Sequence, residues 1–64
     1  MMFSKGDLVR VHMRPTSAQW FNNFHGKVGV ITKAGMRGPI GVWWVLLEGG
    51  QQQSFEPRHL VEVE

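Results

Sequence analysis

The chain has 64 residues, no cysteine and a formal net charge of +2 at pH 7. This length allows one domain with a small core, and the lack of thiols excludes disulfides, thiolate metal sites and cysteine nucleophiles. Lys5, Gly6 and Asp7 interrupt the N-terminal apolar residues before a signal peptide could form, and the longest uncharged run, residues 38–47, is too short to cross a bilayer. We therefore expect a single cytoplasmic domain over residues 1–64 without membrane insertion.

Residues 7–14 alternate between apolar and polar side chains, which predicts a half-buried β-strand. The apolar positions of this strand share one face and are Val9, Val11 and Met13. The polar positions share the other face and are Arg10, His12 and Arg14. The strand is thus expected to turn a basic face to solvent.

A long first loop is expected after the first strand, because Pro15 has no N–H to donate to a ladder. This loop extends through the polar and aromatic residues 16–25. Residues 26–33 then return to strand composition. Gly29 within them is expected where a neighbouring segment passes too closely for a side chain.

The second half of the chain predicts a hairpin and a closing strand. Residues 34–39 have turn chemistry, and the apolar strand at 41–48 is expected to be central in the sheet. Gly49-Gly50 supplies positive φ angles for a tight turn into a returning strand at 51–56. One short 3-10 turn at residues 56–60 is expected to precede the last strand at 61–63.

These elements predict an all-β fold, a single five-stranded SH3-like barrel with a long first loop and one short 3-10 turn before the last strand. Closing the sheet into a barrel would also remove its exposed edges. The expected core consists of Val9, Val11, Val28, Val30, Val45, Leu47 and Leu60.

Three family resemblances follow from ordered groups of residues. Residues 5–11 followed by 26–31 resemble the KOW-type opening of SH3-like domains in ribosomal and transcription proteins, which implies RNA binding. Residues 45–50 with 57–60 resemble the ending of small uncharacterised SH3-like proteins, including phage-encoded ones. A longer resemblance, to the small peripheral SH3-like protein of photosystem I and to related SH3-like accessory subunits, covers Lys5-Gly6-Asp7, Val9-Arg10-Val11, Arg14-Pro15, Ser17, Trp20-Phe21-Asn22, Gly26, Val28, Arg37, Pro39, Phe55 and Leu60-Val61-Glu62-Val63. It implies docking on a larger assembly and extends the expected location to the periphery of a membrane-bound complex.

Catalytic chemistry has few candidates in the sequence. The three histidines, His12, His25 and His59, are far apart in the chain and have no metal-ligand spacing. The sequence contains neither a glycine-rich phosphate loop followed by lysine nor a Gly-x-Ser-x-Gly elbow. We expect no catalytic, cofactor or metal site within one copy of the chain, which leaves open an oligomeric enzyme with a site at a subunit interface.

A binding site is predicted where the aromatic first loop adjoins the basic residues. Residues 1–40 contain six cations against one acidic residue, and such a surface suits an acidic partner. Trp43 and Trp44, adjacent in a strand, must point to opposite faces. The candidate partner-binding residues are Arg10, Arg14, Trp20, Phe21, Asn22, Phe24, His25, Lys27, Lys33 and Arg37.

Two kinds of partner fit these residues. The first hypothesis is a protein-binding module, an accessory subunit whose partner has an acidic surface. The alternative is nucleic-acid binding, with bases stacked on Trp20 or Phe21 and cations against phosphates. A net charge of +2 is small for a nucleic-acid binder, so protein binding is the preferred hypothesis.

Overall fold

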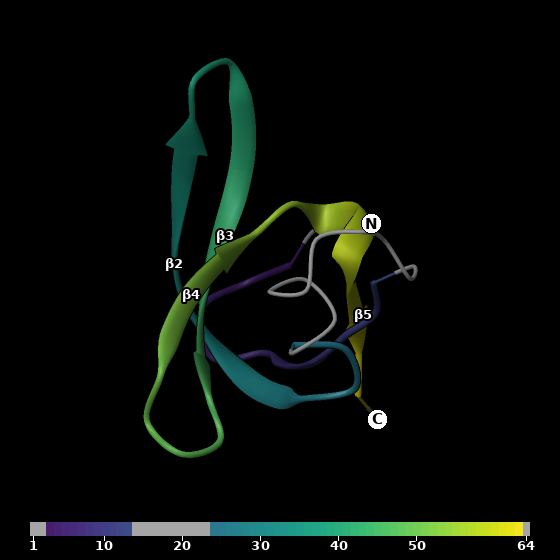
Figure 1. Cartoon of the computed structure of the whole chain (residues 1–64). Coiled ribbons are helices and arrows are strands. Elements are labelled where there is room, and N and C mark those ends of the chain that lie inside the picture. Colours follow the sequence, from purple (N-terminus) through teal and green to yellow (C-terminus); the bar gives the residue numbers. More distant parts are fainter. Residues whose placement is uncertain (1–2, 14–23, 64) are drawn as a thin grey trace.

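The computed structural model describes residues 3–13 and 24–63, which form an all-β arrangement (Figure 1). The elements in chain order are β1 (Leu8–Val11), β2 (Val28–Arg37), β3 (Ile40–Leu47), β4 (Gln52–Phe55), the 3-10 helix η1 (Pro57–His59) and β5 (Leu60–Glu62). The strands form one antiparallel sheet in the order β4-β3-β2-β1-β5. The predicted all-β class, five strands and late 3-10 turn are confirmed. Among the described residues no ladder joins β4 to β5, so the sheet is not closed into a barrel.

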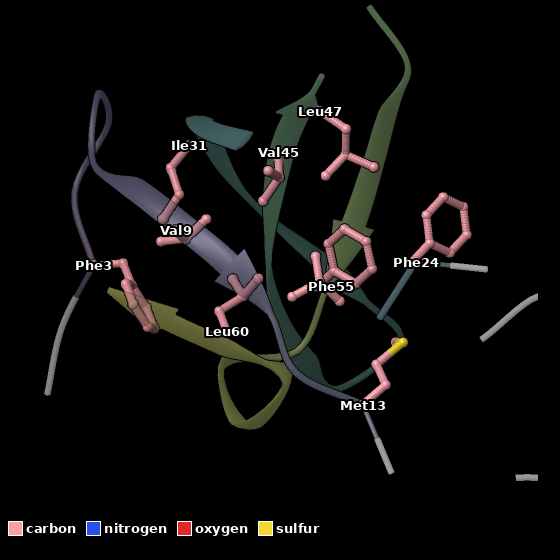
Figure 2. Packing of buried hydrophobic residues seen from close by; sticks show 10 residues of the cluster. Phe3, Val9, Met13, Phe24, Ile31, Val45, Leu47, Phe55 and Leu60 are labelled. Carbon is pink, nitrogen blue, oxygen red and sulfur yellow. The ribbon is translucent and has the colours of Figure 1, made fainter. Parts of the chain in front are cut away.

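The core lies against one face of this curved sheet, which we call the inner face. Its side chains come from all five strands and from segments beside them, and they converge in Figure 2. Phe24 packs its ring edge against Phe55, with ring centroids 5.6 Å apart. Five of the expected core residues are confirmed as buried: Val9, Val11, Val45, Leu47 and Leu60.

The expected burial of Val30 is wrong, and Val28 is only half-buried. Ile31 and Gly29 take the inward positions of β2, so Val28 and Val30 point to the opposite, outer face. A side chain at Gly29 would meet the inner packing at once, because a Cβ there would lie 2.5 Å from the Leu46 carbonyl oxygen. The predicted close approach at Gly29 is confirmed.

The hairpin between β2 and β3 is longer than predicted. Residues 34–37, expected in a turn, continue β2, and the turn contains only Gly38 and Pro39. A register shift between Ile31 and Lys33 marks a bulge within β2. β1 pairs with β2 only at residues 28–30, and β4 pairs with β3 only at residues 43–46. Residues 33–42 therefore extend beyond their neighbours as a two-stranded arm, the projecting hairpin (Figure 1).

The remaining strand boundaries lie close to those predicted. β1 occupies Leu8–Val11 within the expected 7–14, because His12 and Met13 already leave the ladder. Gly49 and Gly50 have φ angles of 92° and 89°, which confirms the predicted turn residues. Trp43 packs against the core and meets Phe3 edge-on, whereas Trp44 belongs to the outer face.

Candidate interaction surface

The structure separates the predicted partner-binding residues into three groups. Arg14, Trp20, Phe21 and Asn22 lie outside the described residues. Phe24, His25 and Lys27 lie just before β2, and Arg10 projects from the outer face of β1. Lys33 and Arg37 belong to the projecting hairpin.

The group before β2 fixes the base of the first loop. Phe24 is 8% exposed and packs in the core, so its ring is not a surface available to a partner. The Nδ1 atom of His25 accepts a hydrogen bond from the Met13 amide at 3.0 Å. The rings of His12 and His25 lie 5.3 Å apart, so two of the histidines that are distant in sequence are neighbours in space.

The outer face of the projecting hairpin is built around Trp44. The Lys33 ammonium lies 5.7 Å from the centroid of this indole, within the range of a cation–π contact. A Cβ at Gly35 would lie 2.8 Å from the Trp44 Nε1 atom, so the absence of a side chain there lets the indole lie on β2. Lys33 is thus held by an intramolecular contact.

Arg37 reaches from β2 across β3 to β4. Its guanidinium donates to the Ser54 carbonyl oxygen at 3.1 Å and also to the Ser54 hydroxyl. Val42, which lies between these positions on the outer face of β3, is 3% exposed. The contact ties the base of the projecting hairpin to the edge strand and fixes the direction in which the hairpin points.

The tip of the projecting hairpin exposes two large apolar side chains. Met36 is 68% exposed and Ile40 is 44% exposed. Neither is among the residues predicted to bind a partner, because the composition of residues 34–39 indicates a turn. Their signal was an apolar residue on each side of Arg37-Gly38-Pro39, in a region where turns are usually polar.

η1 lies near the base of the projecting hairpin. Partial burial of His59 lowers the pKa of its imidazole, the neighbouring Arg58 and Arg37 lower it further, and Glu56 opposes them. Arg58 itself forms an exposed ion pair with Glu56, with 3.4 Å between Nε and Oε1. The net effect favours neutral His59 in the folded chain.

Comparison with known proteins adds no relative to this geometry: the chain matches no protein-family model, no curated protein and no solved structure. Within the described residues, no group of three histidine, aspartate or glutamate side chains could hold a metal ion. The same part of the chain contains no helix with the length and hydropathy needed to cross a membrane.

Proposed function

We propose that this chain is a non-catalytic protein-binding module that contacts a partner with an acidic surface through the projecting hairpin. The observation that supports this most is the exposed pair Met36 and Ile40 at the end of an arm whose base is fixed by Arg37. Apolar side chains presented by a rigid element are typical centres of protein interfaces, where methionine is enriched. Lys33 and Arg37 would surround that centre with positive charge.

The environment of the cations favours a protein over a nucleic acid. Lys33 lies over Trp44 and Arg37 donates to Ser54, so both have intramolecular partners. A phosphate-tracking surface would need several freely placed cations, and the whole chain has a net charge of only +2. Exposed Met36 and Ile40 offer contact area that phosphates do not use.

Nucleic-acid binding is the second candidate because of the shape of the arm. A two-stranded antiparallel ribbon fits the major groove of DNA, and residues 33–42 form such a ribbon with a basic residue on β2 near each end. The KOW-type resemblance of residues 5–11 and 26–31 points the same way.

We also propose that the sheet belongs to an SH3-like barrel. The strand order β4-β3-β2-β1-β5 and the 3-10 turn between β4 and β5 are compatible with that fold. A role as an accessory subunit rests on the resemblance to the small peripheral SH3-like protein of photosystem I. Contact through Arg14, Trp20, Phe21 and Asn22 stays a prediction, since these residues lie outside the described ranges.

Affinity capture from lysate, with and without nuclease, tests the proposed function. We expect a defined protein to be retained by the wild-type chain after nuclease treatment. It should be lost from the double variant Met36→Ser/Ile40→Ser and retained by Val61→Ser, a matched change at a residue 52% exposed outside the hairpin. Loss of all bound material after nuclease would favour the nucleic-acid alternative. Equal capture by both variants would show that the projecting hairpin is not the contact surface.

A further inference from the structure

The outer face of the sheet has an apolar row where polar residues are usual. Antiparallel sheets with one solvated face normally alternate apolar-in and polar-out. Here Leu8 on β1 is paired with Val30 on β2, and Val30 is paired with Leu46 on β3. These residues, which we call the outer row, are 43%, 39% and 43% exposed. Three adjacent strands thus expose apolar side chains at one level of the sheet.

Opposite charges flank β2 at the next level. Arg10 on β1 is paired with Val28. Glu48 lies opposite Val28 on the other side, where its amide donates to the Val28 carbonyl oxygen at 3.1 Å. One Glu48 carboxylate oxygen accepts from the Val28 amide at 3.1 Å, which keeps the negative charge beside β2. Arg10 and Glu48 are both exposed.

We propose that the outer row is a self-association surface, on which two copies of the chain pack face to face about a two-fold axis that runs along β2. Such a rotation exchanges the two sides of β2 and keeps the level along the strand. Val30 then meets Val30 of the second copy, and Leu8 meets its Leu46. Arg10 meets the second copy's Glu48, and the reciprocal pair forms by symmetry.

Charge complementarity is what selects a second copy as the occupant. Had Arg10 and Glu48 carried the same charge, the same rotation would bring like charges together and oppose association. Sheets pack face to face with strands within about 30° of each other, which this axis permits. A small stable interface needs roughly 500 Å² from each partner. That is about one ninth of the 4489 Å² surface of the chain.

Sedimentation velocity of the full chain across a wide concentration range tests the proposal. We expect a reversible monomer–dimer equilibrium. Val30→Lys places two ammonium groups at the two-fold axis and should leave only monomer. Met36→Lys is the matched control, the same introduced charge at the tip of the projecting hairpin, and should dimerise like the wild type. Circular dichroism of each variant verifies the fold, which the exposure of Val30 and Met36 should preserve.

Charge reversal tests the register of the two copies. Arg10→Glu should weaken the dimer roughly tenfold, because two exposed attractive pairs become repulsive. Adding Glu48→Arg to it should restore most of the affinity. A wild-type chain that is monomeric at every concentration would overturn the proposal, as would dimerisation of Val30→Lys or a double reversal no tighter than Arg10→Glu alone. The hairpin variants are not involved, so this test is independent of the proposed function.

Discussion

The two faces of the sheet use the same kinds of side chain in opposite environments. Val45 on the inner face of β3 is fully buried, whereas Val30 on the outer face of the adjacent β2 is 39% exposed. Leu47 and Leu46, neighbours on one strand, differ in the same way, at 3% and 43%. Residue type therefore does not distinguish the faces. The inner face should determine how stable the fold is, and the outer face should determine what the chain associates with.

The largest expected effect is at the inward position without a side chain. Gly29→Ala would place a Cβ 2.5 Å from the Leu46 carbonyl oxygen and 2.6 Å from the Val45 Cγ1 atom. Relief requires backbone movement in β2 or β3, so we expect the free energy of unfolding to fall by about 3 kcal/mol. Gly41→Ala is the control, because nothing lies within 4 Å of a Cβ there. Its cost should be within about 0.5 kcal/mol, measured by urea unfolding. Equal costs would show that the two strands do not approach as described.

A smaller effect separates two matched valines. Val45→Ala removes two buried methyl groups and should lower the free energy of unfolding by about 2 kcal/mol. Val30→Ala should change it by less than about 0.5 kcal/mol when measured at a concentration where the chain is monomeric. A large cost at Val30 would mean that part of the chain covers the outer row, and the distinction between the faces would fail.

The smallest effect concerns η1, at the margin between the faces. Burial and nearby Arg58 lower the pKa of His59 in the folded chain, while in the unfolded chain it titrates near its ordinary value. As pH falls through about 6.5, the unfolded chain binds a proton before the folded chain does, so stability decreases until the folded pKa is passed. Urea unfolding at several pH values should show a smaller decrease over this window for His59→Gln than for the wild type. Identical pH profiles would contradict the inferred shift.

The sequence by itself determined the features that depend on neighbours along the chain. Period-two alternation over residues 7–13 identified Val9, Val11 and Met13 as inward-facing, and Gly49-Gly50 located the turn into β4. Pro57 and the residues after it indicated the 3-10 turn. These signals are local, because alternation, positive φ and the restricted φ of proline follow from a few adjacent residues.

The tertiary structure alone decided the features that depend on strand pairing. Val28, Val30 and Ile31 are all plausible core residues by type, and a shift of one residue exchanges the faces of a strand. Only the pairing with β1 and β3, together with the bulge between Ile31 and Lys33, placed Val30 outward and continued β2 to Arg37. The alignment of Leu8, Val30 and Leu46 and the contact between His12 and His25 join segments distant in sequence. Such contacts are set by long-range packing, which no local pattern encodes.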